Sequence, residues 1–258
     1  MITIIFGKPG VGKTALNTYF AIQNMMDRRR YFNCVNDING MNAEGYNFSL
    51  PPLPHTVFSN YTIFNRSRYC SGIFTYLFNP YKFSLPNDDI EFELLPPYSS
   101  YHITEGQTVL NSRKSKNFRS CVSGAYENHR HIDLDIFIDM QRPKLADVNI
   151  RELVSNFIAV LALTHKTDSM GRIISSTWYT LEFDDWSLVE KYLSTKDENL
   201  GVAKTYTFEG NIFICYNSKC NKCKFYQMGY NKDFKYILSS ESDKISLVAP
   251  SNFYEKGA

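Results

Sequence analysis

The sequence predicts an α/β fold with a mainly parallel central sheet flanked by helices, plus an antiparallel β extension at the C-terminal end. Three observations support this prediction. The first half of the chain alternates short apolar runs with helix-like segments, which is typical of parallel βαβ units. The second half carries consecutive strand-like runs joined by turn signals. The 258 residues also include 18 Tyr and 19 Phe, and such aromatic content favours strands.

Composition limits the class of protein. The chain is 43% hydrophobic and 21% charged, with a net charge of +2, which is ordinary for a globular protein. Charge alone therefore gives no case for nucleic-acid binding. No apolar stretch reaches the roughly 18 residues that a membrane-spanning helix needs. The first residues also lack the charged segment of a signal peptide, so we expect neither feature.

The core elements are expected in a regular order. Residues 2–6 form a short, β-rich apolar run that ends at a glycine, which predicts a buried strand. Residues 14–29 predict a helix with one apolar face, and the arginines at 28–30 suit its C-terminus. The Asn-rich residues 36–47, followed by prolines at 51, 52 and 54, indicate a linker.

The rest of the chain predicts one domain over residues 1–258, with a core at about 1–165 and a β-rich extension at about 166–258. Residues 65–97 are aromatic and interrupted by prolines, so we interpret them as an insertion in the core. The expected strands cover residues 56–61, 99–105, 133–140, 157–163, 172–183, 204–208 and 211–216. Further helices are expected over residues 117–128 and 149–155.

A glycine-rich loop directly follows the first strand. Its eight residues, Gly-Lys-Pro-Gly-Val-Gly-Lys-Thr, fill every fixed position of the pattern G-x-x-x-x-G-K-[ST]. Such a loop predicts an ATP site, because its backbone N–H groups turn inward around phosphates and the following helix adds its dipole. We expect Lys13 to reach the β- and γ-phosphates and Thr14 to bind Mg²⁺. The predicted nucleotide-binding residues are Gly7, Lys8, Pro9, Gly10, Val11, Gly12, Lys13 and Thr14.

An enzyme that hydrolyses the nucleotide also needs an acidic group at the end of a second strand. The best candidate is the strand that ends in Thr104 and Glu105. Glu105 stands where a water-activating base belongs, and Thr104 stands where a magnesium-organising Asp is usual. This alignment leaves the site one negative charge short. The alternatives are that Glu105 is an ordinary surface acid, and that the acidic strand is the one containing Asp139.

The next predicted strand is followed by Gln141. A glutamine just past a central strand can contact the γ-phosphate and report its presence. By itself this signal is weak, and a polar loop residue is the alternative. The order of phosphate loop, acidic strand and glutamine-ended strand favours the functional interpretation.

Residues 105–153 resemble the zonula occludens toxin (Zot)-type ATPases of filamentous phages, which belong to the FtsK/HerA-like P-loop class. Weaker likeness extends to a second strand at residues 57–61 and a closing motif at 215–218. The specific blocks are His129-Arg130-His131 before the apolar strand at 133–140, then Gln141-Arg142-Pro143, then Val148-Asn149-Ile150-Arg151-Glu152-Leu153.

The resemblance implies an ATPase, with ATP and Mg²⁺ as cofactors, that drives filamentous virion assembly and export. It implies a cytoplasmic domain, in the host cell and peripheral at the inner membrane. Because ATP is an intracellular ligand, we also expect the six cysteines to be reduced. The resemblance further implies a homo-oligomeric ring and contacts with other phage assembly proteins. Arg130 matches a basic residue that acts across subunits in related translocases, with Arg151 as second choice. The predicted catalytic residues are thus Lys13, Glu105, Gln141 and Arg130.

Two other functions stay open. A DNA-translocating or packaging ATPase of the same class would take nucleic acid as its substrate, although the near-neutral charge supports this little. A nucleotide-dependent switch with little hydrolysis is favoured by Thr104 at the usual Asp position. The sequence also departs from the family pattern at Asn217, where the closing motif has Asp, and in lacking a membrane span.

Two groups of candidate metal ligands do not support a zinc site. Cys215, Cys220 and Cys223 have only part of the spacing of structural zinc sites, which use four protein ligands. We therefore expect thiols without metal in this segment. His129 and His131 have only one further His or Cys close in sequence, so we expect polar contacts there as well.

Overall fold

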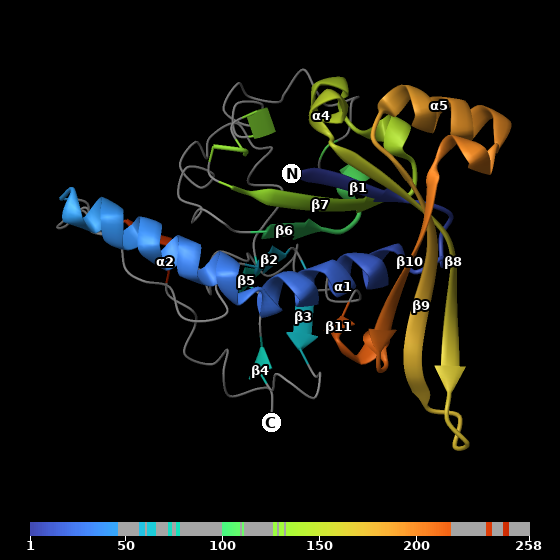
Figure 1. Ribbon diagram of the computed structural model, residues 1–258, viewed down its shortest axis with the longest axis horizontal. Helices are drawn as coiled ribbons and strands as arrows, with labels where there is room; N and C mark the ends of the chain where they lie inside the picture. The colour runs from blue at the N-terminus through green and yellow to red at the C-terminus, as the bar shows by residue number, and fades with distance from the viewer. Residues whose placement is uncertain are drawn as a thin grey trace.

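The computed structural model contains a twisted central sheet with helices on both faces (Figure 1). Among the helices of the described residues, none combines the length and the apolar character that a bilayer crossing requires. The structure describes residues 1–45, 57–59, 61–65, 72–73, 76–77, 100–108, 110, 126–127, 129–131, 133–217, 236–238 and 245–247.

The described strands form an eight-stranded sheet in the order β10-β9-β8-β1-β7-β6-β2-β5. From β8 to β5 in this order, each pair of adjacent strands is parallel, so this part is the predicted parallel core. The strands of this part are β1 (Ile2–Phe6), β2 (Val57–Ser59), β5 (Tyr76–Leu77), β6 (Ser100–Ile103), β7 (Asp135–Met140) and β8 (Asn156–Thr167).

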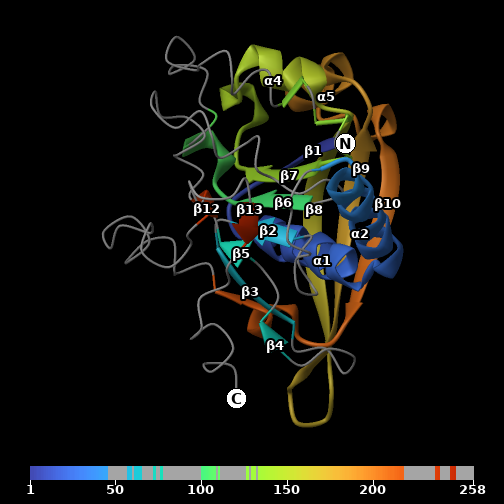
Figure 2. The same ribbon diagram turned by 90° about the vertical axis from the view of Figure 1, so that its left-hand side faces the viewer.

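The antiparallel extension continues the same sheet. β9 (Ile173–Phe183) pairs antiparallel with β8, and β10 (Val202–Glu209) pairs antiparallel with β9. Figures 1 and 2 show that the β8–β9 hairpin extends well beyond the parallel strands. The predicted combination of a parallel sheet with an antiparallel extension is therefore confirmed, and β8 belongs to both parts.

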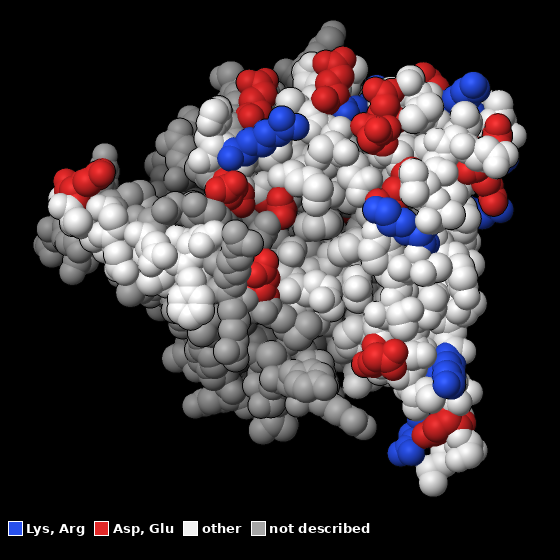
Figure 3. All heavy atoms as spheres, in the orientation of Figure 1, with Lys and Arg blue, Asp and Glu red and all other residues white. Residues whose placement is uncertain are grey.

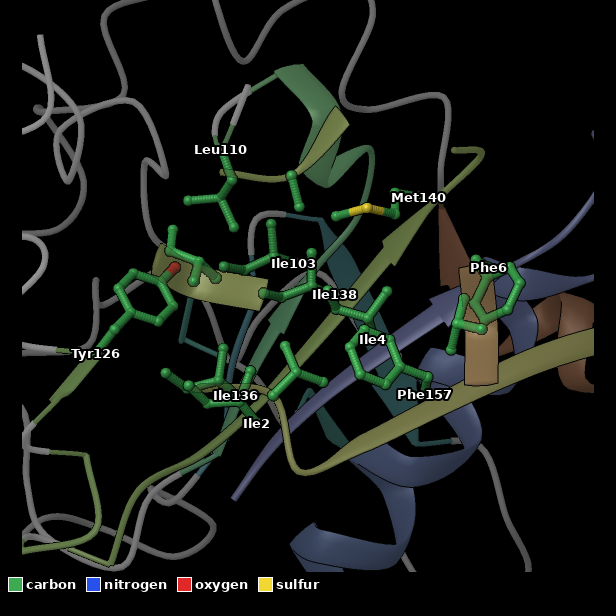
Figure 4. Packing of buried hydrophobic residues seen from close by; sticks show 14 of the residues in the cluster. Ile2, Ile4, Phe6, Ile103, Leu110, Tyr126, Ile136, Ile138, Met140 and Phe157 are labelled. Atoms are coloured by element: carbon green, nitrogen blue, oxygen red, sulfur yellow. The ribbon is translucent and has the colours of Figure 1, made fainter. Parts of the chain in front are cut away.

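Two apolar clusters lie on the two faces of the sheet. On one face the strands pack under α4 (Val148–Leu153) and α5 (Trp186–Thr195), and on the other they pack against α1 (Lys13–Met26). Alternation along β1 produces this division, because successive side chains of a strand point to opposite faces. Figure 4 shows the first cluster, in which Ile4 of β1 lies beside Ile138 of β7.

The segment after α1 corrects the sequence prediction. The arginines at 28–30 were expected to end a helix, but they begin a second one, α2 (Arg28–Ala43), after a break at Asp27. The linker expected from residue 36 is therefore wrong up to Ala43. Asn and Gly have low helix propensity, but the deficit of about 1 kcal/mol per residue or less does not forbid a helix, and the first proline comes only at residue 51. Figure 1 shows α2 continuing outward from the end of α1.

The C-terminal part contains a helix that the strand pattern did not predict. Asp185 caps the N-terminus of α5, and its carboxylate accepts a hydrogen bond from the backbone N–H of Ser187 at 2.6 Å. The strand expected at residues 211–216 is also wrong in part, because a 3-10 helix (Ile212–Ile214) precedes β11 (Tyr216–Asn217). Both corrections have the same cause, since short apolar runs do not by themselves distinguish strands from helical turns.

The remaining strands form two small sheets. β3 (Thr62–Asn65) pairs with β4 (Gly72–Ile73) on one side and with β11 on the other. β12 (Tyr236–Leu238) pairs with β13 (Ile245–Leu247). The expected insertion at 65–97 contributes the end of β3 at Asn65, β4 and β5. Its other residues lie outside the described part, as does most of the helix expected at 117–128. Short 3-10 helices cover Gly106–Thr108, Pro143–Leu145 and Glu198–Leu200.

Trp178 is the largest fully buried side chain, and it joins β9 to the α1 face of the sheet. We expect Trp178→Ala to lower the free energy of unfolding by about 3–5 kcal/mol, because it leaves a large cavity. Tyr179→Ala is the control, since the neighbouring Tyr179 is 45% exposed and should cost less than about 1 kcal/mol. Denaturant unfolding measures both values, and equal losses would contradict this account of the core.

Candidate functional site

The glycine-rich loop joins β1 to α1 and is held against the antiparallel extension. Gly12, which directly precedes α1, has a φ of +85°, a conformation that favours glycine. A Cβ atom on Gly12 would lie 2.5 Å from Cδ2 of Leu163. The indole Nε1 of Trp178 donates a hydrogen bond to the Gly12 carbonyl at 3.1 Å. The loop conformation is therefore fixed by side chains of β8 and β9.

Lys13 lies inside this loop. Its Nζ donates a hydrogen bond to the Lys8 carbonyl at 2.9 Å, and only 8% of the residue is exposed. Burial lowers the pKa of Lys13, and the nearby carboxylates of Asp139 and Glu105 partly offset this effect. The ammonium group is thus placed between the loop and two acidic residues, as a phosphate-binding lysine requires.

Three parallel strands end at the same edge of the sheet. β7 lies between β1 and β6, with Asp139 beside Ile5 and Ile138 beside Ile103. Asp139 is therefore next to the strand that enters the phosphate loop. Thr104, the residue after Ile103, follows the end of β6 on the other side of Asp139. Carboxyl ends of parallel strands are where ligands bind in open α/β sheets.

A row of hydrogen bonds joins these strand ends to α1. The Thr104 hydroxyl donates to Oδ1 of Asp139 at 3.1 Å and lies 3.2 Å from the Thr14 hydroxyl. Because the Thr104 proton is used on Asp139, Thr14 is the donor in the second bond. A hydroxyl that donates in this way keeps its lone pairs for a cation. The predicted magnesium-binding Thr14 is therefore coupled to Asp139 through Thr104.

Asp139 is the buried carboxylate of the site. Only 2% of the residue is exposed, and burial raises its pKa to about 6, although hydrogen bonds from neighbouring groups oppose the rise. Besides Thr104, the donors are the Glu105 backbone N–H at 3.2 Å and the Asn17 amide at 3.4 Å. These bonds come from the turn after β6 and from α1, so the carboxylate is held by two parts of the fold.

A cavity of about 290 Å³ opens over these groups. The phosphate loop forms one wall, and the ends of β6 and β7 form another. Phe213 and Tyr216 close a third side, and both come from the C-terminal extension. The lining residues are Pro9, Gly10, Gly12, Lys13, Thr14, Glu105, Asp139, Met140, Gln141, Phe213 and Tyr216.

Two predicted catalytic residues lie at the mouth of this cavity. Glu105 is exposed, has a φ of +55°, and directly follows Thr104. Its carboxylate accepts a hydrogen bond from the side-chain amide of Gln107. Gln141 is exposed and comes directly after β7. The structure therefore brings Lys13, Thr14, Glu105 and Gln141 to one cavity.

The predicted arginine fingers lie elsewhere. Arg130 is exposed in the turn before β7, where its carbonyl accepts a hydrogen bond from the Asp133 N–H. This turn precedes the amino end of β7, whereas the cavity lies at the carboxyl end. Arg151 on α4 places its guanidinium 4.5 Å from the centre of the Trp186 ring. Neither arginine lines the cavity of its own chain.

The candidate zinc ligands are not gathered into a metal site in the described residues. His129 is buried, and its Nδ1 contacts the Tyr126 carbonyl; desolvation lowers its pKa. His131 is exposed. Cys215 is buried with its Sγ 3.8 Å from the Asn211 carbonyl. Cys220 and Cys223 lie outside the described residues, so the expectation for this segment stays a prediction.

The oxygen atoms around the cavity suit Mg²⁺. The Thr14 hydroxyl and the carboxylates of Asp139 and Glu105 are the hard donors that this ion prefers. Among the described residues, no group of three or more His, Cys, Asp or Glu side chains could hold a metal by itself. Magnesium in nucleotide sites takes few protein ligands and completes its shell with phosphate oxygens and water. The donor set therefore fits an ion that arrives with a nucleotide.

Several site residues were not assigned a role from the sequence. Asn17 is one helical turn after Thr14, and this spacing could have placed it on the same face of α1. Trp178, Phe213 and Tyr216 come from the distant C-terminal part. No local pattern connects these aromatic residues to the phosphate loop, so only the folded sheet shows that they border it.

The loop glycines give a direct test of this geometry. Gly10 and Gly12 both have φ near +85°, but a Cβ atom meets nothing within 4 Å at Gly10 and clashes with Leu163 at Gly12. Gly10→Ala should cost about 1–2 kcal/mol in strain. Gly12→Ala should cost a further 1–3 kcal/mol, roughly, from overpacking. Denaturant unfolding compares the two variants, and an equal loss would show that the loop is not held by β8 and β9.

Comparisons with known proteins identify similar folds among solved structures. No protein-family model and no curated protein matches the chain. The N-terminal domain of zonular occludens toxin from Neisseria meningitidis shares 20% identity, with 84% of this chain and 98% of that chain covered and a TM-score of 0.46. The genome packaging NTPase B204 from Sulfolobus turreted icosahedral virus 2, solved with ATP-gammaS, shares 11% identity over 80% and 96%, with a TM-score of 0.37. The α/β fold is assigned from the strand order and loop of this chain itself.

Proposed function

We propose that this protein is an ATP-binding and ATP-hydrolysing motor of Zot type that drives filamentous virion assembly and export. The observation that carries the proposal is the cavity at the carboxyl edge of the sheet. It gathers a phosphate-loop lysine, a hydroxyl for Mg²⁺, an exposed carboxylate and a glutamine, contributed by Lys13, Thr14, Glu105 and Gln141.

The chemistry assigns each group a role. The loop N–H groups and the Lys13 ammonium bind the β- and γ-phosphates. Mg²⁺, held by Thr14, would neutralise charge that develops on the phosphate oxygens. Glu105 orients a water molecule and takes its proton as the water oxygen attacks the γ-phosphorus. The bond from that phosphorus to the bridging oxygen breaks, and ADP and phosphate leave. Gln141 contacts the γ-phosphate and responds to its loss.

Arg130 belongs to a site shared between subunits in this proposal. Because it lies near the amino end of β7, it cannot serve the cavity at the carboxyl end of its own chain. A head-to-tail ring would instead present one subunit's Arg130 to the next subunit's nucleotide. A guanidinium there stabilises the charge of the transition state and links hydrolysis to ring geometry. The single domain, the host cytoplasmic location at the inner membrane and the assembly partners are parts of the same proposal.

A DNA-translocating or packaging ATPase is the second candidate function. Figure 3 shows Lys and Arg interspersed with Asp and Glu over the described residues of one face. A continuous basic stripe, which would favour a nucleic-acid track, is not a feature of the described residues on that face. DNA-stimulated turnover would favour this candidate, and tight ATP binding without turnover would favour the nucleotide switch.

Substitutions at Lys13 and Glu105 should affect ATP binding and ATP hydrolysis separately. Lys13→Ala should weaken ATP binding by an order of magnitude or more, because it removes a charge-assisted contact of about 1.5–3 kcal/mol. Glu105→Gln should bind ATP normally and lose steady-state hydrolysis. Lys144→Ala is the control, since this exposed lysine pairs with Glu190 away from the cavity. Unchanged calorimetric binding of ATP by Lys13→Ala would overturn the proposed site.

A mixing experiment tests the shared site. Arg130→Ala should bind ATP but turn it over at least about tenfold more slowly, since an arginine finger contributes a large factor to the rate. Mixing it with Lys13→Ala should restore part of the activity, because some interfaces then carry both intact halves. Mixtures with Arg172→Ala, an exposed hairpin arginine paired with Asp168, serve as the control. Activity independent of protein concentration, with no oligomer in light scattering, would exclude a shared site.

A further inference from the structure

We propose that Asp139 on β7 supplies the magnesium-organising carboxylate that this class of site usually carries at the position of Thr104 on β6. The inference rests on the proposed ATPase function and adds a residue to it. The uncharged Thr104 leaves that position without a carboxylate. The structure shows that the neighbouring strand carries a carboxylate at the same level of the sheet.

The register of the sheet places Asp139 on β7 next to Thr104 at the end of β6. Ile138 lies beside Ile103, so the residues that follow, Asp139 and Thr104, are also neighbours. The Thr104 hydroxyl donates to Asp139 at 3.1 Å, which joins the two positions directly. The Asp139 carboxylate therefore lies at the end of β6 and lines the cavity, although it belongs to the neighbouring strand.

The direction of the hydrogen bonds links Asp139 to the magnesium ligand. Thr14 donates to Thr104, and Thr104 donates to Asp139. Asp139 thus orients the Thr14 hydroxyl with its proton turned away and its lone pairs kept for a cation. It also adds a negative charge beside that hydroxyl. Both effects favour a divalent ion next to the phosphates, so Asp139 acts as a positioning residue.

Buried neighbours hold the Asp139 carboxylate in place. The Asn17 amide donates to it and to the Ile103 carbonyl, so the Asn17 carbonyl oxygen is the acceptor from Nδ1 of His102 at 2.8 Å. His102 is itself buried and bonds Ser100 through Nε2 at 3.1 Å. Outer groups of this kind orient the ligands of metal sites and strongly affect affinity.

Packing alone does not account for an acid at this position. Asp139 stands in a strand whose flanking residues, Ile138 and Met140, are fully buried, and its partner in the sheet is the fully buried Ile5. An aliphatic side chain would avoid the cost of burying a charge, but the donors of Thr104, Asn17 and Glu105 would then lose this acceptor. The position instead carries a carboxylate, which accepts from three donors in the turn after β6 and in α1.

The test compares Asp139→Asn with a swap variant, Thr104→Asp with Asp139→Thr, which returns the carboxylate to the usual strand. Calorimetry measures ATP affinity with and without Mg²⁺, and electron paramagnetic resonance measures Mn²⁺ binding with a non-hydrolysable ATP analogue. In Asp139→Asn we expect about a tenfold or greater loss of metal affinity, in line with outer-shell substitutions at metal sites. ATP affinity without metal should not fall, because the substitution removes a negative charge near the phosphates. The swap variant should recover metal affinity to within about threefold of the unaltered chain.

The outcomes separate this inference from the proposed function. Unaltered metal affinity in Asp139→Asn, or an equal loss of ATP affinity with and without Mg²⁺, would overturn the role of Asp139 while the ATP site stands. If Asp139→Asn does not fold, the swap variant decides, since a swap that folds without binding metal contradicts the proposal. Failure of the unaltered chain to bind ATP would reject the proposed function and the inference with it.

Discussion

The parallel register of β7 between β1 and β6 is the constraint on which the site depends. It places Asp139 beside Ile5, two residues before the phosphate loop begins, and beside Thr104 at the end of β6. Because successive side chains of a strand point to opposite faces, a shift of one residue would turn the Asp139 side chain to the opposite face. The buried isoleucines of the three strands oppose such a shift, so the apolar core sets the geometry of the polar site.

The antiparallel extension has a structural role in the nucleotide site. Trp178 on β9 donates to the carbonyl of Gly12, and Leu163 on β8 fills the space that a side chain at Gly12 would need. The extension also supplies Phe213 and Tyr216 to the cavity. Contact with the packed sheet thus fixes the backbone at Gly12, where the loop enters α1. This preorganisation lowers the entropy cost of binding.

In the proposed ATPase, Asp139 and Arg130 would complete the site in two different ways. The carboxylate comes from an adjacent strand of the same chain, and its burial within hydrogen bonds makes it rigid. The arginine is exposed and lies near the opposite edge of the sheet, so it can reach a nucleotide only from a second subunit. The first arrangement couples the metal to the folded core. The second would couple hydrolysis to assembly, which is what a motor requires.

The sequence by itself determined the phosphate loop, the first strand, the start of α1 and the order of acidic and glutamine-ended strands, because each rests on a local pattern. It also predicted that Glu105 and Gln141 would meet Lys13, since carboxyl ends of parallel strands share one edge. The tertiary structure alone decided that Asp139 faces Thr104 and that Trp178 holds the loop. Those contacts join residues far apart in the chain, and they depend on strand register and sheet order, which short-range periodicity does not encode.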